Sequence, residues 1–193
     1  MTEFDSETST LVPTRPDPGW PKAIGVISII LGLLSIVLGS LGMVFSWFVL
    51  PGLVESQLNG APLPPNMQMS PAMLAYATAS ALVNLLLVTA GVQTFCRRGV
   101  GRTMHLAYAV LLSITTIGGT YFQYQLARET LAWAQDYPDN PIAQQASAGG
   151  EVGQLIGLLA GSALSLAWPV FCIIWFGMVK RDADAMRGGA ADD

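Results

Sequence analysis

The distribution of charge along the chain constrains its fold more than any other feature. Of its 193 residues, 13 are Asp or Glu and 9 are Lys or Arg, and none of these lies within residues 23–54, 103–127 or 152–179. About 20 consecutive apolar helical residues cross the roughly 30 Å hydrocarbon core of a bilayer. Each of the three stretches is longer than that, so the chain is predicted to be an integral membrane protein.

Composition supports the same conclusion. Charged residues make up 11% of the chain and apolar residues 52%, whereas a soluble domain carries about 25% charged residues. The chain therefore lacks the polar surface that a water-exposed globule needs. Its net charge is −4, and it has no extended basic face, so a nucleic-acid partner is not expected.

The pattern predicts an all-α protein with four transmembrane helices joined as two αα-hairpins. The helices are expected at about residues 22–50, 71–95, 103–126 and 152–179. They form one domain over residues 21–180. The polar N-terminal tail, residues 1–20, is expected to be disordered because it cannot bury enough apolar surface, and residues 181–193 form a second tail. The first helix is too long for the apolar region of a cleaved signal peptide.

Several helix ends are marked by local signals. Pro21 suits the first position of a helix, and Pro51 with Gly52 is expected to stop the first span. Ser70 and Pro71 supply an N-cap and a first-turn residue for the second span.

The second half of the chain is expected to depart from simple straight spans. The helical pattern of the third span can continue beyond the membrane as far as Pro138, and a polar loop is expected over residues 138–150. Pro169 is expected to kink the fourth span, because proline removes a backbone donor and crowds the preceding turn.

Basic residues predict the orientation. The two longer loops, which lie on one side of the membrane, carry only Arg128. The other side carries the remaining eight: Arg15, Lys22, Arg97, Arg98, Arg102, Lys180, Arg181 and Arg187. Because Lys and Arg accumulate on the cytoplasmic side, both termini are expected in the cytoplasm, with the chain in the plasma or inner membrane of the cell.

Two spans carry small residues at regular spacing, in the manner of a glycine zipper. The seam of the first span alternates steps of three and four: Gly25, Ser28, Gly32, Ser35, Gly39, Gly42 and Ser46. The seam of the fourth span has steps of four: Gly153, Gly157, Gly161 and Ser165. Such patterns let helix backbones approach closely in lipid. The sequence leaves open whether they pack within one chain or between copies.

Among the amide side chains, Asn84 is expected to be the most deeply placed in the membrane. The third span offers the hydroxyl groups of Thr115, Thr116 and Thr120. A hydrogen bond between helices is the expected role of Asn84, and contact with a substrate is the alternative. No ionisable residue lies mid-span, which argues against a coupled transporter or pump.

No catalytic, cofactor-binding or metal-binding residue is predicted, so we do not expect an enzyme. His105 has no companion at metal-ligand spacing, and Cys172 is expected to be a small core residue. Cys96 lies beside Arg97 and Arg98. An enzyme would require His105, Cys96 and an acid to meet at one inner cavity.

The first span carries a G-x6-G-L-x5-G pattern at Gly25, Gly32, Leu33 and Gly39. Over about 20 residues it resembles the first helix of the B-lymphocyte-antigen-like tetraspan family and that of several bacterial four-span membrane proteins. The resemblance implies a four-helix membrane fold. The outer loops lack the cysteines of many animal tetraspan proteins, and no functional residue is carried over.

These observations predict a structural, accessory or interaction subunit without catalysis. The bilayer is its expected environment, and another copy or a different membrane protein its expected partner. An oligomeric passive channel or small-solute transporter is the alternative. A continuous polar stripe, with Asn84 and the threonines of the third span facing one lumen, would favour the channel. Polar groups paired inside a tight bundle would favour the accessory role.

Overall fold

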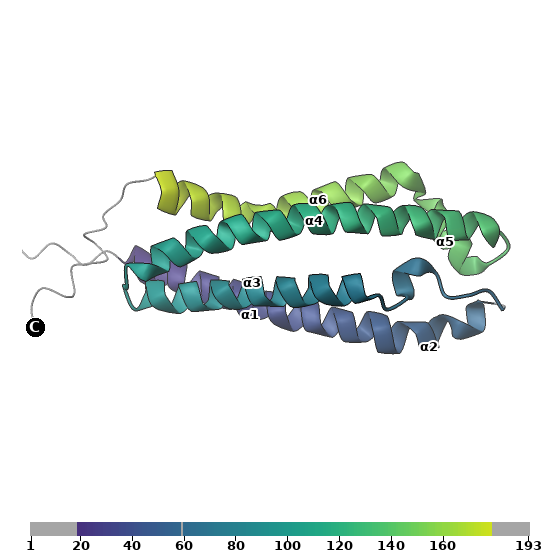
Figure 1. Ribbon diagram of the computed structural model, residues 1–193, viewed down its shortest axis with the longest axis horizontal. Coiled ribbons are helices and arrows are strands. Elements are labelled where there is room, and N and C mark those ends of the chain that lie inside the picture. The colour runs from purple at the N-terminus through teal and green to yellow at the C-terminus, as the bar shows by residue number, and fades with distance from the viewer. Residues whose placement is uncertain (1–18, 59, 179–193) are drawn as a thin grey trace, which may run out of the picture.

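The computed structural model describes residues 19–58 and 60–178, and all of the regular secondary structure in these ranges is helical (Figure 1). Four segments are long and apolar enough to cross a membrane: Trp20–Gln57, Pro71–Phe95, Val100–Asp136 and Gly150–Gly177. The predicted all-α fold with four candidate spans is confirmed. Apart from residues 19 and 20, the predictions for the two tails lie outside the described residues.

The first span is longer than predicted. It comprises α1 (Trp20–Val44), a π-helical segment η1 (Phe45–Val49), α2 (Leu50–Val54) and a 3₁₀ turn η2 (Glu55–Gln57). The prediction that Pro51 ends the helix is wrong. The wider turns of η1 precede Pro51, which falls in the first turn of α2, where a helix needs no backbone donor.

The second and third spans follow their sequence signals closely. After the 3₁₀ turn η3 (Pro65–Met67), α3 occupies Pro71–Phe95, and Ser70 Oγ accepts a hydrogen bond from the Met73 backbone N–H at 3.2 Å. The next helix, α4, extends over Val100–Asp136. Its 37 residues span about 55 Å at 1.5 Å per residue. It therefore projects well beyond a 30 Å hydrocarbon core.

The polar loop predicted at residues 138–150 contains a short helix, α5 (Pro141–Ala148). Asn140 caps it, because its side-chain oxygen accepts a hydrogen bond from the Ile142 N–H at 2.9 Å. The fourth span consists of α6 (Gly150–Cys172) and the π-helical η4 (Ile173–Met178). Pro169 lies inside α6, one turn before the change to π-helix, so the helix changes its hydrogen-bonding pattern near the expected kink.

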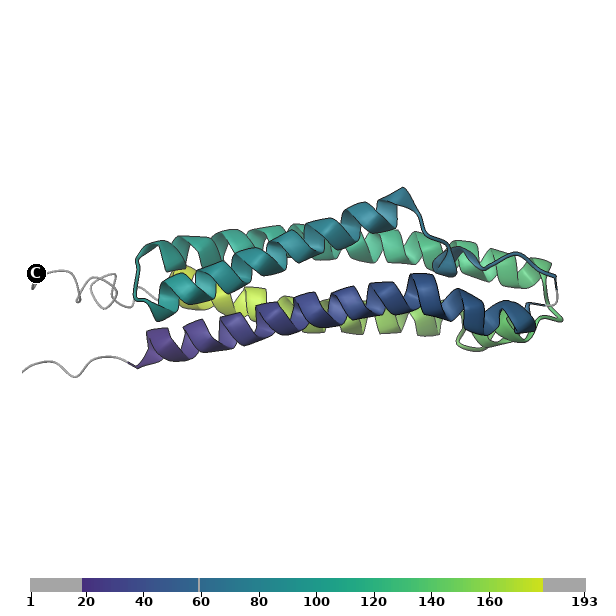
Figure 2. The same ribbon diagram turned by 90° about the horizontal axis from the view of Figure 1, so that it is seen from below.

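The helices form two antiparallel hairpins that lie side by side (Figures 1 and 2). Helix α1 packs on α3, α4 packs on α6, and α3 packs on α4 to join the hairpins. The start of α1, the α3–α4 turn and η4 lie together at one end of the bundle. We call this the terminal end.

At the opposite end, the cap, the chain builds a small second core. Its buried side chains come from the α2–α3 connection, the end of α4, and α5: Leu58, Trp133, Ala134, Ile142 and Ala143. Trp133 Nε1 donates a hydrogen bond to the Pro62 carbonyl at 3.1 Å. Asn140 Nδ2 donates to the Leu58 carbonyl at 2.8 Å. These bonds tie the two connecting segments together.

The sides of the bundle are apolar and exposed. Large aliphatic side chains on every span are open, among them Leu38, Leu82, Ile114, Ile117, Leu159 and Leu164. Leu164 is 80% exposed and Ile117 is 67% exposed. Hydrocarbon, unlike water, favours contact with such a surface. The fold is therefore that of a membrane protein.

Candidate functional site

A buried polar junction joins the spans at the terminal end. The Ser28 hydroxyl on α1 lies 2.8 Å from His105 Nε2 on α4, and His105 Nδ1 lies 2.8 Å from the Gly101 carbonyl. Thr94 Oγ1, from the end of α3, lies 3.3 Å from the same Nδ1. Because a carbonyl only accepts, Nδ1 carries the proton of the neutral ring. Nε2 then accepts a hydrogen bond from the Ser28 hydroxyl.

Close backbone approach makes this junction possible. A Cβ at Gly101 would collide with Thr94, so only glycine lets α4 begin this near to α3. The Phe176 ring stacks on the His105 ring at 4.7 Å between centroids. Arg102 Nε donates a hydrogen bond to the Phe176 carbonyl at 2.8 Å. The junction therefore holds α1, α3, α4 and η4 together.

The junction has a nucleophile–base pair but no access. Ser28 and His105 both have 0% exposed surface, and a hydrolytic serine must reach a substrate carbonyl. Cys96 is exposed, and Cys172 is buried in the core, as predicted. Within the described residues, no group of three or more His, Cys, Asp or Glu side chains could hold a metal ion. We assign the junction a structural role.

The seam of the first span divides into two halves. A Cβ at Gly25 would lie 2.7 Å from the Phe95 nitrogen, and one at Gly32 would lie 2.6 Å from Val88 Cγ2. These glycines, with the fully buried Ser28, bring α1 against α3. Gly39 and Gly42 face open space.

Beyond Gly32, α1 and α3 enclose a groove of about 360 Å³. Seam residue Ser35 lines it, together with Gly39, Ser40, Ser80 and Asn84. The last seam residue, Ser46, lies half-buried in η1. The helices thus pack tightly near the terminal end and separate toward the cap.

No other helix of the chain packs against the α6 seam. Apart from the backbone of α6 itself, no atom lies within 4 Å of a Cβ built at Gly153, Gly157 or Gly161, although Gly157 also lines a pocket between α4, α6 and η3. Ser165 is exposed, and its hydroxyl donates to the Gly161 carbonyl of its own helix at 2.9 Å. Helix α6 packs on α4 through other residues, such as Ser162, which hydrogen-bonds Thr120.

The intramembrane polar residues do not share one space. Asn84 Nδ2 donates to the Ser80 carbonyl within α3 at 2.9 Å, so the predicted interhelical hydrogen bond is wrong. Thr115 donates to the Leu111 carbonyl at 3.0 Å, and Thr120 donates to the Thr116 carbonyl at 2.8 Å. Asn84 lines the α1–α3 groove, whereas Thr120 contacts α6.

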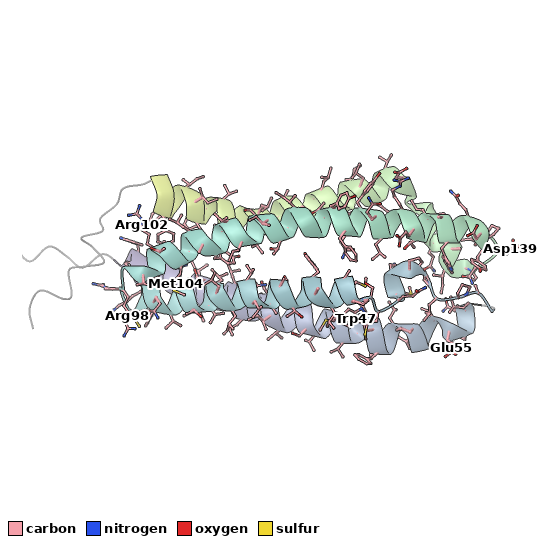
Figure 3. All side chains as sticks on the ribbon, in the orientation of Figure 1. Trp47, Glu55, Arg98, Arg102, Met104 and Asp139 are labelled. Carbon is pink, nitrogen blue, oxygen red and sulfur yellow. The ribbon has the colours of Figure 1, made fainter. Side chains whose placement is uncertain are left out.

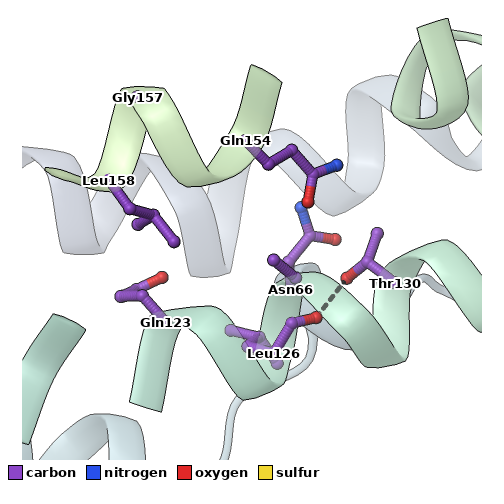
Figure 4. Close-up of a pocket in the computed structure, with 8 residues that line it drawn as sticks. Asn66, Gln123, Leu126, Thr130, Gln154, Gly157 and Leu158 are labelled. Carbon is purple, nitrogen blue, oxygen red and sulfur yellow. Dashed lines mark hydrogen bonds between the residues drawn. The ribbon is translucent and has the colours of Figure 1, made fainter. Parts of the chain in front are cut away.

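A second pocket, of about 330 Å³, lies between α4, α6 and η3 (Figure 4). The amides of Asn66, Gln123 and Gln154 line it. Gln154 Nε2 donates to the Ala146 carbonyl at 3.1 Å, and its Oε1 is buried without a partner. Sequence reasoning did not select Asn66 or Gln154, because each is an isolated amide beside a predicted loop.

Comparison of the chain with known protein families, curated proteins and solved structures gives no match.

Proposed function

We propose that this chain is a non-catalytic accessory subunit that associates with another transmembrane helix, in the first instance that of a second copy, through the α6 seam. The observation that carries the proposal is the open space at Gly153, Gly157 and Gly161. Close backbone contact is the main use of small-xxx-small spacing in lipid.

The other hairpin shows how such residues behave when they have a neighbour. At Gly25 and Gly32 of α1 and at Gly91 of α3, an added Cβ would meet the facing helix at 2.6–2.8 Å. Leu164, which is 80% exposed, falls on the same side of α6 as Gly153 and Gly157 at 100° per residue. The seam and this leucine together supply a groove and a ridge for a partner helix.

The polar groups support an accessory role over a channel. Asn84, Thr115 and Thr120 each donate a hydrogen bond to a carbonyl of their own helix, so these donors have partners without a water-filled lumen. They also lie in two separate helix pairs. We propose the plasma or inner membrane as the site of the protein, with both termini cytoplasmic, on the strength of the Lys and Arg distribution.

Light scattering of the detergent-solubilised chain, corrected for bound detergent, tests the association. We expect a mass that is a multiple of 20.5 kDa for the wild type, and a monomer for Gly161→Leu. Ala163→Leu is the matched control. It lies at nearly the same depth on α6, exposed, about 200° around the helix, and should keep the wild-type mass.

A wild-type monomer would contradict pairing between copies. The partner of the α6 seam would then be a different membrane protein, which cross-linking from Gly161→Cys and from Ala163→Cys in native membranes would identify. Identical cross-linking patterns from the two positions would contradict the use of the α6 seam altogether.

A further inference from the structure

In the part of the chain that the structure describes, the two ends of the bundle carry opposite charge. At the terminal end lie Lys22, Arg97, Arg98 and Arg102, and none of the Asp or Glu residues in the described part of the chain lies there. All five of those acids belong to the cap end: Glu55, Glu129, Asp136, Asp139 and Glu151. Figure 3 shows Arg98 and Arg102 at one end, with Glu55 and Asp139 at the other. The described residues at the terminal end therefore form a basic surface that is complementary to an anion.

Arg97 occupies a position that normally belongs to glycine. Its φ is 57°, the only positive φ of a non-glycine residue in the described part of the chain. The Arg97 N–H bonds the Thr94 carbonyl, and the Arg98 N–H bonds the Gln93 carbonyl, both at 2.9 Å. This pattern ends α3 in a left-handed turn, for which glycine is the usual residue.

Glycine is nevertheless present close by, where it is not needed. Gly99 has a φ of −55°, which any residue adopts, and a Cβ there would meet nothing. The turn thus places a long cationic side chain where backbone geometry favours glycine. A residue held in an unfavourable backbone conformation points to a use for its side chain.

The groups beside these cations are of the kind that concentrates at the level of lipid headgroups. Arg102 is held against η4 by its bond to the Phe176 carbonyl. Trp20 packs edge-on against Trp175 at 6.0 Å and lies 6.4 Å from the Phe176 ring. Tryptophan concentrates at the membrane–water interface. The arginines of the α3–α4 turn lie at the same end, just beyond the apolar spans.

We propose that the terminal end binds the headgroup of an anionic phospholipid, with Arg97 and Arg98 as its principal contacts and with Lys22 and Arg102 adding to the field. Guanidinium groups pair with phosphate oxygens through two parallel hydrogen bonds. Clusters of basic residues beside a transmembrane helix favour anionic lipids. The proposal does not depend on the pairing of α6.

Lipid retention tests the site. The full chain in an uncharged detergent is mixed with equimolar phosphatidylglycerol and phosphatidylcholine, passed over gel filtration, and its retained lipids are quantified by mass spectrometry. We expect the wild type to retain phosphatidylglycerol in excess. Combining Arg97→Gly with Arg98→Gln should lower the ratio about tenfold or more. Arg128→Gln, at the cap end, is the matched control and should not change it.

Two further variants separate binding from folding. Arg97→Gly removes the guanidinium from a position where backbone geometry favours glycine, so we expect weaker retention of phosphatidylglycerol by a chain that keeps its helical circular dichroism spectrum. Arg97→Lys keeps the charge and should keep the preference. An unchanged lipid ratio in Arg97→Gly, whatever its thermal midpoint, would assign Arg97 a structural role and overturn the proposal.

Equal retention of the two lipids by the wild type would overturn it as well. If Arg128→Gln lowers the ratio of phosphatidylglycerol to phosphatidylcholine as much as the Arg97→Gly and Arg98→Gln combination does, the proposal is also overturned, because the net charge of the protein alone would then set the preference. Addition of inorganic phosphate distinguishes the source of the anion. Release of the retained phosphatidylglycerol by phosphate at the same ionic strength as a sodium chloride control would assign the surface to free phosphate instead.

Discussion

Ser28 serves two purposes at one position. Its small side chain lies in the seam that brings α1 against α3, and its hydroxyl bonds His105 on α4. The sequence predicted the first role from the spacing of small residues. It did not predict the second, because the two residues are 77 positions apart and neither has a local pattern that refers to the other.

Asn84 illustrates the opposite outcome. A buried amide in lipid needs a partner, and the sequence pointed to a neighbouring helix. The carbonyl four residues earlier, that of Ser80, lies within reach of the side chain and takes the bond. The separation of α1 from α3 beyond Gly32 leaves a groove beside the amide. Competition between a helix's own carbonyl and a neighbouring helix is decided by packing, which spacing alone does not encode.

The Ser28–His105 bond should contribute measurably to stability. In a double-mutant cycle of Ser28→Ala and His105→Ala, we expect a coupling of about 0.6–1.7 kcal/mol, from the average to the largest value for hydrogen bonds between membrane helices. Unfolding in mixed micelles, followed by circular dichroism, provides the free energies. Ser40→Ala, an exposed serine of the same helix that lines the α1–α3 groove, is the control. A coupling near zero would contradict the role of the bond.

At the scale of helices, the sequence was most informative where a cap and a proline coincide. Ser70 and Pro71 predicted the start of α3 correctly. Asn140 and Pro141 carry the same signal for α5. The polar composition of the surrounding segment nevertheless predicted a loop there. Pro51 was misinterpreted as a stop. Its effect depends on the π-helical turns before it, and these have no local sequence signature.

Trp133 should hold the cap together without contributing to the spans. Truncation of Trp133 to Ala removes a side chain that is 7% exposed, together with its bond to the Pro62 carbonyl. We expect loss of hydrogen-exchange protection at residues 55–68 and in α5, while α3 and α6 stay protected. Tyr121→Ala, 65% exposed on the same helix, should change little. Uniform loss of protection along all spans would contradict a separate cap.

At the scale of the whole molecule, the number of spans and the fold class could be predicted because the charge distribution and the 30 Å core of the bilayer permit few alternatives. The pairing of the hairpins was less accessible. The seams at Gly25 and at Gly157 look alike in the sequence, yet one is buried against α3 and the other is open. The face of α6 that meets α4 decides between them, and Ser162 rather than the seam lies on that face.

The proposed orientation predicts a labelling pattern. Cys96 is exposed at the terminal end, so a membrane-impermeant maleimide should label it only after intact cells are permeabilised. In a Cys96→Ser background, Gln145→Cys, exposed on α5 at the cap, should be labelled without permeabilisation. The buried Cys172 is present in both proteins and is expected to stay unlabelled. Labelling of Cys96 in intact cells would contradict the proposed orientation and would indicate that the terminal end faces the outside.

The separation of charge between the two ends also links insertion to bioenergetics. The cap end carries five carboxylates and one guanidinium, that of Arg128, which leaves four negative charges to cross the bilayer in the proposed orientation. A cell whose interior is electrically negative drives anions outward. At about 2.3 kcal/mol per charge per 100 mV, a potential of about 100 mV contributes roughly 9 kcal/mol to the transfer of four charges. Dissipating the potential with an ionophore should therefore slow translocation of the cap while leaving the finished bundle intact.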